Sequence, residues 1–414
     1  IFMKDLKKQK LFNYFKSIEI DLLPVLIDMQ YNGIFIDKNY LENRSGEIGK
    51  KIESLESEII DLAGEEFNLN SSQQLAVILF DKLKLPMIKK RSTAEAVLSE
   101  LKDKHPLPEL ILSYRKLYKL KNTYLDPLPS YIISETQRVH SSFNQTMTAT
   151  GRLSTSSPNF QNIPIRTEDG KEIRKAIKAQ SNEYQIFSAD YSQVELRVMA
   201  HLSGDESLIS ALNNGEDIHT FTAKNIFNID NDDMVLPEMR RIAKIVNFGI
   251  MYGAGPFRLS QELDIPFGEA KQIKDAYFKK YQGIEKYIEN SKLQIKETKS
   301  VETLLGRKRA VWDSDSQNKI RRDAAERMAI NMPIQGTAAE MIKLAMIKIH
   351  RQMNKENLKS KLIMQIHDEL LLEVHQDEID YISKMVIENM RDAMKLDVPI
   401  EIDFGVGPSW YEAH

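Results

Sequence analysis

The chain has 414 residues, a formal net charge of −3, a pI near 6.3 and no cysteine. Its length allows about two or three cooperating subdomains, whereas the lack of cysteine excludes disulfides and thiolate metal sites. The near-neutral charge argues against a generic nucleic-acid-coating protein, and the lack of an apolar run of about 18 residues or a signal-like N-terminus predicts a soluble intracellular protein with no membrane partner.

The first predicted elements are an apolar segment over residues 22–36 and a long amphipathic helix. Asp37 is a predicted N-cap, and the helix stops at Gly64. Between them, apolar residues recur at alternating spacings of four and three: Ile48, Ile52, Leu55, Ile59 and Leu62. A second helix over residues 108–122 is a candidate packing partner. The connection carries a basic cluster of Lys82, Lys84, Lys89, Lys90 and Arg91.

Two short acidic peptides each follow a run that is typical of a buried strand. Residues 185–189 precede Asp190-Tyr191-Ser192, and residues 362–366 precede His367-Asp368-Glu369. A carboxylate at the end of an apolar strand is costly to desolvate unless a cation or hydrogen-bond donors compensate it. Two of them indicate a metal site, although an Asp in this position is also a common turn former or N-cap.

Between the acidic peptides, residues 240–253 form a predicted helix that is cationic at its start and aromatic at its end. Cations there could hold phosphates while the rings stack on a base; the alternative is a solvated edge beside a core edge. At helical spacing, five of its side chains share a broad face: Arg240, Arg241, Lys244, Phe248 and Tyr252.

The remaining elements are outlined by composition. Residues 214–314 are predicted to be helices with short loops, and residues 400–407 alternate as a strand before Trp410 and Tyr411. A second basic track precedes the first acidic peptide, and basic tracks of this kind suit a duplex, although a charge run is usually a solvated face. It comprises Arg166, Lys171, Arg174, Lys175 and Lys178.

In these motifs the chain resembles the family A DNA polymerases, of the DNA polymerase I type, in their polymerase module. The resemblance spans nearly the whole chain. The matching stretches occur in the family's order: residues 148–154, 158–166, 190–197, 217–220, 240–253, 331–339 and 367–369.

The resemblance implies an α+β right-hand polymerase with an antiparallel palm sheet, helical fingers and a helical thumb. Palm would comprise residues 1–36, 137–213 with the first acidic motif and 315–414 with the second. Thumb would comprise residues 37–136 and fingers residues 214–314. The chain begins at Ile1 without methionine, where the family's polymerase module follows its exonuclease domains, so we expect a piece of a longer chain that also carries these domains. We also expect the protein to be monomeric.

The implied function is template-directed 5′-to-3′ DNA synthesis in replication or repair, adding dNTPs to the 3′-hydroxyl of a primer-template DNA by two-metal phosphoryl transfer. The location would be the cytoplasm or nucleoid, or a DNA-containing organelle. Asp190, Asp368 and the Tyr191 carbonyl would hold two Mg²⁺ ions, which Mn²⁺ could replace. The part of Glu369 stays open between direct ligation and an outer-shell role.

The resemblance assigns further roles to side chains around the metals. Lys244 would donate a proton to the leaving pyrophosphate, and Glu195 would block a 2′-hydroxyl. Nucleotide-binding residues would be Gln193, Glu195, His219, Arg240, Lys244, Phe248 and Tyr252. DNA-binding residues would be Arg152, Arg166, Asn331, Gln335 and His367.

Three other functions are compatible with parts of the sequence. Single-subunit RNA polymerases share the aspartates and the cationic helix but usually lack a glutamate at the position of Glu195. A non-catalytic duplex-binding module predicts the loss of an aspartate or of Lys244, and all are present. A metal-dependent nuclease also uses paired carboxylates, but it leaves the cationic-aromatic helix unexplained.

Overall fold

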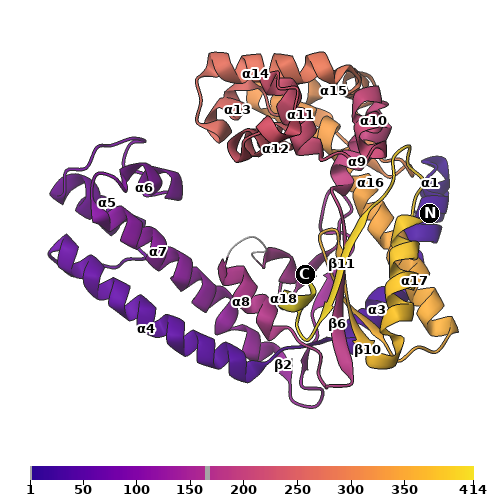
Figure 1. Ribbon diagram of the computed structural model, residues 1–414, viewed down its shortest axis with the longest axis horizontal. Coiled ribbons are helices and arrows are strands. Elements are labelled where there is room, and N and C mark those ends of the chain that lie inside the picture. Colours follow the sequence, from indigo (N-terminus) through magenta and orange to yellow (C-terminus); the bar gives the residue numbers. More distant parts are fainter. Residues whose placement is uncertain (1, 164–167) are drawn as a thin grey trace.

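The computed structural model describes residues 2–163 and 168–414. Its helices and antiparallel sheets confirm the predicted α+β class. Figure 1 shows three bodies in an open arc: a helical arm with α4 to α7, a central sheet with flanking helices, and a helical lobe with α10 to α15. Among the described residues, no helix is long and apolar enough to cross a membrane.

The central sheet has four antiparallel strands in the order β11-β6-β10-β9. They are β6 (Tyr184–Tyr191), β9 (Lys361–Ile366), β10 (Glu369–His375) and β11 (Ile402–Gly407). The three strands predicted from the sequence are present. However, Asp190 lies within β6 rather than after it, because Asp190 and Tyr191 pair with Asp403 and Ile402 of β11.

Each face of the sheet packs against a different core. Phe187, Ala189 and Tyr191 join the core of α16, α17 and the lobe, whereas Ile186 joins the core at the base of the arm. Side chains alternate between faces along a strand, so Asp190 shares the face of Ile186. Glu369 is the register partner of Asp190. The sheet therefore presents its carboxylates on the side of the arm, toward the inside of the arc (Figure 1).

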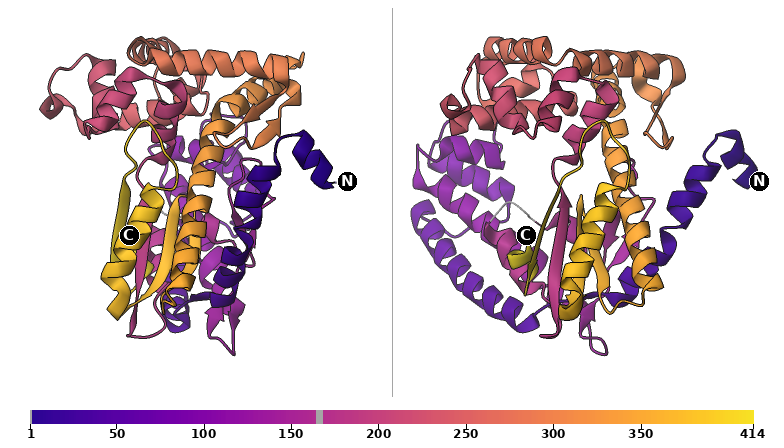
Figure 2. Two further views of the ribbon diagram at one scale, coloured as in Figure 1. Left: turned by 90° about the vertical axis from the view of Figure 1, so that its right-hand side faces the viewer. Right: turned by 45° about the vertical axis from the view of Figure 1, so that its right-hand side comes forward.

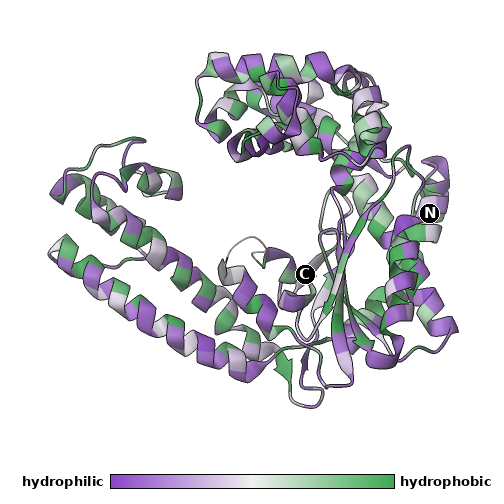
Figure 3. Cartoon of the chain, viewed as in Figure 1, coloured by the Kyte–Doolittle hydropathy of each residue, from purple (hydrophilic) through white to green (hydrophobic). Residues whose placement is uncertain are grey.

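The arm is a pair of packed helices, α4 (Lys38–Ala63) and α7 (Pro106–Leu120), with α5 (Ser72–Ala76) and α6 (Glu95–Leu101) at its far end. The predicted caps are confirmed: Asp37 accepts a hydrogen bond from the Tyr40 amide at 2.9 Å, and Gly64 ends α4 with φ +72°. Figure 3 shows hydrophobic and hydrophilic residues along both long helices. Leu62 was predicted to lie on the packed face, but it is 40% exposed.

The lobe contains a hairpin that the prediction of helices alone missed. Its two strands, β7 (Ser300–Glu302) and β8 (Lys308–Ala310), have three residues each, too few for a readable alternation. The helices of the lobe and of its junction with the sheet are α9 (Val194–Ser203), α10 (Glu206–Asn213), α11 (Ile218–Phe227), α12 (Pro237–Met251), α13 (Pro256–Leu263), α14 (Phe267–Lys280) and α15 (Gln282–Thr298).

A long helix, α16 (Lys319–Lys355), connects the lobe to the sheet layer (Figure 2). It packs against α15 and β7 near the lobe and against α17 (Ile379–Arg391) behind the sheet. Further elements include α1 (Phe2–Lys8), α2 (Phe12–Tyr14), the π-helix η1 (Phe15–Ile20), α3 (Leu23–Asn32), β1 (Ile34–Phe35), β2 (Ile132–Ile133), β3 (Arg138–Val139), β4 (Ser142–Asn144), β5 (Ser154–Ser156), α8 (Glu168–Ala176) and α18 (Trp410–Ala413).

Candidate active site

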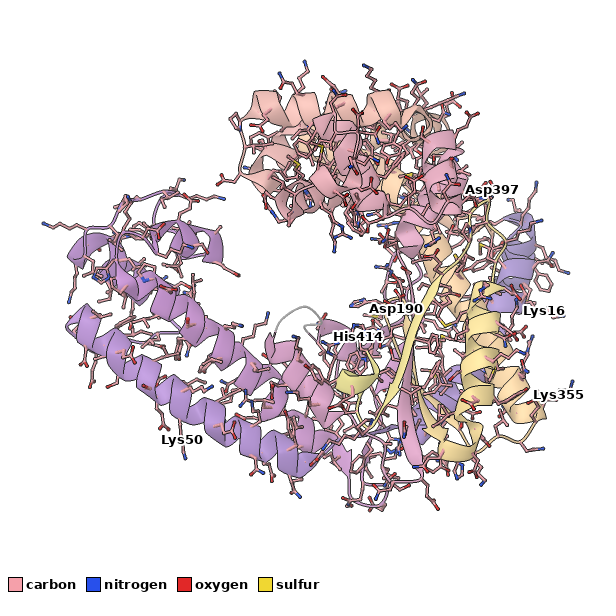
Figure 4. The ribbon with its side chains drawn as sticks, viewed as in Figure 1. Lys16, Lys50, Asp190, Lys355, Asp397 and His414 are labelled. Carbon is pink, nitrogen blue, oxygen red and sulfur yellow. The ribbon has the colours of Figure 1, made fainter. Side chains whose placement is uncertain are left out.

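The two predicted aspartates meet at one end of the central sheet. Asp190 comes from β6, and Asp368 comes from the tight turn between β9 and β10. His367 adopts a left-handed conformation in this turn, with φ 52°. The Tyr191 amide donates a hydrogen bond to the Asp368 carbonyl at 3.2 Å, which fixes the turn beside the strand. Figure 4 labels Asp190 on the inner side of the arc, near the C-terminal His414.

The electrostatics at this pair favour a bound cation. Burial, Glu369 and Asp368 raise the pKa of Asp190 to about 7, and burial raises the pKa of Asp368 although Arg152 opposes this. Neighbouring carboxylates that resist ionisation together are stabilised in the charged form by a divalent cation. Two carboxylates with a backbone carbonyl are also the oxygen ligands that Mg²⁺ prefers, so the donor set fits such an ion.

Within residues 2–163 and 168–414, no third acidic or histidine ligand completes the pair. The described residues contain no group of three or more His, Asp or Glu side chains placed to hold a metal. Instead, Glu369 Oε1 accepts hydrogen bonds from Ser188 Oγ at 2.6 Å and Trp410 Nε1 at 2.7 Å, and His414 Nδ1 lies 3.4 Å away. These donors occupy Glu369 within the protein and favour its outer-shell alternative.

Arg152 and Glu195 connect Asp368 to the end of α12. Arg152 Nη2 lies 2.7 Å from Glu195 Oε1 and 3.6 Å from Asp368 Oδ1. The Tyr252 hydroxyl donates to the other Glu195 oxygen at 2.7 Å. Glu195 is 5% exposed, and burial raises its pKa against the effects of Arg152 and Tyr252. The structure thus brings four predicted site residues into one network, and their mutual pairing was not predicted from the sequence.

The cationic face of α12 is divided by its ion pairs. Arg240 Nη2 lies 2.6 Å from Asp217 Oδ2, whereas Arg241 turns to Glu238 on the exposed side of its own helix. Lys244 is half-buried and makes no ion pair or side-chain hydrogen bond within the described ranges. Arg241 therefore does not contribute to the predicted phosphate-binding face of α12. On this helix, Lys244 is the cation that is still available for a ligand.

Beside Lys244, His219 of α11 is buried against α12. Asn247 Nδ2 lies 3.1 Å from His219 Nδ1, and the rings of His219 and Phe248 lie 5.8 Å apart. Burial lowers the pKa of His219 to about 4, with smaller effects from Arg240 and Lys244. The imidazole is therefore neutral at pH 7. The rings of Phe248 and Tyr252 follow along the helix, 6.4 Å apart.

The other predicted residues line two cavities or start a helix. Gln193 precedes α9 with φ 51°. Asn331 and Gln335 line a cavity of about 410 Å³ together with Tyr252, Thr150, Met328, Met332 and three arginines that the sequence reading did not select, Arg258, Arg309 and Arg327. Arg152 and His367 line a second cavity, of about 250 Å³. Arg166 lies outside the described residues.

Gln161 was also missed as a site residue, although it lies within a matching motif. Its Nε2 donates to the Gln365 carbonyl at 2.8 Å, and its Oε1 accepts from the His367 amide at 3.1 Å. Both contacts hold the turn that carries Asp368. Since they join residues more than 200 positions apart, no local pattern could have indicated them.

Comparisons with known proteins agree with this geometry. The model of the family "DNA polymerase family A" matches residues 38–412. The chain is 44% identical to DNA polymerase I of Bacillus subtilis, covering 99% of this chain and 47% of that protein. It is 47% identical to the thermostable DNA polymerase I of Thermus filiformis, covering 98% and 49%. The chain spans about half the length of these curated relatives.

A solved structure shares the whole fold. It is the POL domain of Pol1 from M. smegmatis in complex with DNA primer-template and dNTP, with a TM-score of 0.95 and 38% sequence identity. The match covers 99% of this chain and 73% of that chain.

Proposed function

The chain belongs to DNA polymerase family A, and on this premise we propose that it catalyses template-directed 5′-to-3′ DNA synthesis in replication or repair. The observation that carries the proposal is the network of Asp368, Arg152, Glu195 and Tyr252, which joins one member of the Asp190–Asp368 carboxylate pair to the cationic-aromatic helix α12. The similar solved structure holds DNA primer-template and dNTP, so these are the proposed partners.

The three bodies of the arc suit the three parts of a right-hand polymerase. Residues 1–36, 137–213 and 315–414 are the proposed palm, residues 37–136 the thumb and residues 214–314 the fingers. A duplex lying on the carboxylate face of the sheet would have the arm on one side and the lobe on the other (Figure 1). We further propose that the module acts as a monomer within a longer chain that also has exonuclease domains, in the cytoplasm or nucleoid or in a DNA-containing organelle.

Asp190, Asp368 and the Tyr191 carbonyl are the proposed ligands of two Mg²⁺ ions, with Mn²⁺ as a substitute. When bound, such ions lower the pKa of the primer 3′-hydroxyl and neutralise the triphosphate. For the rest of phosphoryl transfer, the protein mainly has to position the reacting groups and to stabilise the charge that develops on them. The protein supplies both by fixing Asp368 in a tight turn and Asp190 in a paired strand.

On the nucleotide side, Lys244 is placed to hold the triphosphate and to donate a proton to the leaving pyrophosphate. Neutral His219 can donate a hydrogen bond to a phosphate oxygen without adding charge. Arg240 can bind a phosphate oxygen if its ion pair with Asp217 breaks. Phe248 and Tyr252 would bracket the sugar and base, and Gln193 would contact the nucleotide from the start of α9.

Glu195 is the proposed barrier to a ribonucleotide. Arg152 and Tyr252 hold both of its oxygens, so it is fixed where a 2′-hydroxyl would have to enter. On the DNA side, Arg152, Asn331, Gln335 and His367 are the proposed donors to the minor-groove acceptors that every correct base pair presents, and Arg166 is a further proposed contact. This arrangement favours a DNA polymerase over an RNA polymerase.

Primer extension with a labelled primer, a template and four dNTPs tests the proposed reaction. We expect Asp190→Asn and Asp368→Asn to lower the rate by about 100-fold or more, with primer-template affinity largely kept because phosphate contacts elsewhere provide it. Asp403→Asn is the matched control, since Asp403 pairs with Asp190 in the sheet but is exposed. Extension by either aspartate variant within about tenfold of wild type would contradict the assignment.

A further inference from the structure

A partly buried ionic cluster lies next to the candidate active site and contains none of the residues assigned to it. It consists of Glu19, Arg307, Glu340 and Lys343. Glu340 and Lys343 are each 1% exposed, and Lys343 Nζ lies 2.9 Å from Glu19 Oε1. Burying charges is costly, and an ion pair in the interior is often no more stable than apolar residues of the same volume. Stability alone therefore does not account for this cluster.

The ionic cluster joins segments that are far apart in sequence. Glu19 lies in η1 and also pairs with Arg307 at 3.1 Å, from the turn of the β7–β8 hairpin. Tyr14 and Gln145 donate further hydrogen bonds to the Glu19 carboxylate, at 3.2 and 2.9 Å. Helix α16 supplies both Glu340 and Lys343. The hairpin, the N-terminal helices and α16 are therefore tied together at this point.

The hairpin and α16 also enclose the turn Thr148–Arg152. Gly151 has φ +87°, and a Cβ on it would lie 2.8 Å from Arg307 Nε. A Cβ on Gly336 of α16 would lie 3.2 Å from the Thr150 carbonyl oxygen and would overlap the methyl group of Thr303. The Thr303 hydroxyl in turn donates to Glu340. The turn thus packs directly against Arg307 on one side and against α16 on the other.

At the end of this turn, the Arg152 guanidinium lies between Glu195 and Asp368, at 2.7 and 3.6 Å. We propose that the ionic cluster positions Arg152 for the primer terminus, with Arg307 as the positioning residue that acts on the turn. The proposal rests on the proposed function, because it is DNA synthesis that gives Arg152 its role. Within the part of the chain that the structure describes, Arg307 makes no hydrogen bond or ion pair with Asp190, Asp368 or α12, so its influence passes through the turn.

The expected effect falls on the nucleotide-addition rate. A misplaced Arg152 would disturb the primer 3′ end, whereas the triphosphate contacts of Lys244 and His219 would stay intact. A displacement of about 1 Å in a positioning group can slow a reaction by about 100-fold. Arg307→Leu should therefore lower the single-turnover rate at saturating dNTP by about 10- to 100-fold and leave the apparent dNTP affinity unchanged.

A double-mutant cycle in the purified protein tests the route through Arg152. If Arg307 acts by positioning Arg152, Arg307→Leu should slow wild type but cause no further loss in an Arg152→Ala background, since effects through one group are not additive. Thr303→Val removes the hydroxyl that donates to Glu340 and accepts from the Arg307 amide, and it should show the same pattern with a smaller loss. It serves as the second variant if Arg307→Leu does not fold, as judged by thermal unfolding.

Arg351→Leu is the matched control. Arg351 pairs with Asp21 at 2.7 Å and so also joins α16 to the end of η1, but it lies 11 residues beyond Glu340, about 16 Å along the helix. Its variant should extend primers at the wild-type rate. Losses that multiply in the double mutant, or a loss of dNTP affinity at an unchanged rate, would overturn the inference while wild type remains active. Failure of wild type to extend a primer would instead overturn the proposed function.

Discussion

Phe248 is the side chain whose chemistry makes the sharpest prediction at the scale of one residue. Its ring is half-buried, between His219 and Tyr252, and it carries no hydroxyl that could replace a missing sugar 3′-hydroxyl. The protein should therefore discriminate against dideoxynucleotides. Phe248→Tyr supplies the missing partner and should raise dideoxynucleotide use by about 100-fold or more, with ordinary incorporation little changed. Single-turnover assays with matched dNTP and ddNTP measure this; parallel losses for both would show that the ring is structural.

Glu195 makes a separate prediction about sugar choice. Since Arg152 and Tyr252 fix its carboxylate, truncation to Glu195→Ala should open space for a 2′-hydroxyl. The ratio of ribonucleotide to deoxyribonucleotide incorporation should rise by about tenfold or more. Glu238→Ala is the matched control, because Glu238 pairs with Arg241 on the exposed side of α12. An unchanged ratio in a competition assay would remove Glu195 from this role.

His219 gives a pH-dependent prediction. Burial lowers its pKa to about 4 from 6.5, so the unfolded state binds the proton at a higher pH than the folded state does. The stability contributed by neutral His219 is therefore full above pH 6.5 and is lost as the pH falls toward 4, by about 2 kcal/mol at pH 5. His219→Gln cannot protonate, and its melting temperature should fall less between pH 7.5 and pH 5. Equal losses in both proteins would contradict the burial argument.

At the scale of elements, the sequence predicted the helices, caps and strands that are determined by residues close together in the chain. Helix α4 and its caps depend on neighbours within a few residues, as the bond from the Tyr40 amide to Asp37 shows, and strands β6 and β9 are short runs in which apolar and aromatic residues predominate. The β7–β8 hairpin was missed because strands of three residues are too short to show an alternation of apolar and polar residues. The link between Arg152 and Glu195, and the Gln161 contacts, were also missed. These contacts form between segments that are far apart in the sequence. A short window of sequence therefore carries no information about them.

The N-cap of α4 allows a stability test at this scale. Asp37 caps the helix and also pairs with Lys178 at 2.8 Å. Asp37→Ala should destabilise the arm by about 1–2 kcal/mol, with faster hydrogen exchange in the first turn of α4. Asp61→Ala is the control at the other end of the helix, where an acidic residue opposes the dipole and its removal should be neutral or slightly stabilising. Equal exchange in the two variants would contradict the capping role.

For the whole molecule, the formal charge of −3 means that binding to a DNA polyanion must rely on local positive surfaces. The structure divides the basic cluster of the arm into two classes. Lys82 pairs with Glu65, and Arg91 pairs with Asp81 at 2.5 Å. The three others are exposed and make no ion pair with any residue that the structure describes: Lys84, Lys89 and Lys90. Only the second class is free to replace counterions on phosphates.

This division predicts how salt should act on primer-template binding. Each phosphate neutralised by a lysine adds about −0.9 to the slope of log K against log salt concentration. Replacing Lys84, Lys89 and Lys90 together by Gln should therefore flatten the slope by up to about 2.7 and weaken binding most at low salt. Arg91→Gln is the matched control, since its charge is already offset by Asp81, and it should leave the slope nearly unchanged. Fluorescence anisotropy over a salt series measures both. If the triple variant keeps the wild-type slope, the tip of the arm does not touch the duplex, and the proposed thumb must grip DNA through the helices nearer the sheet.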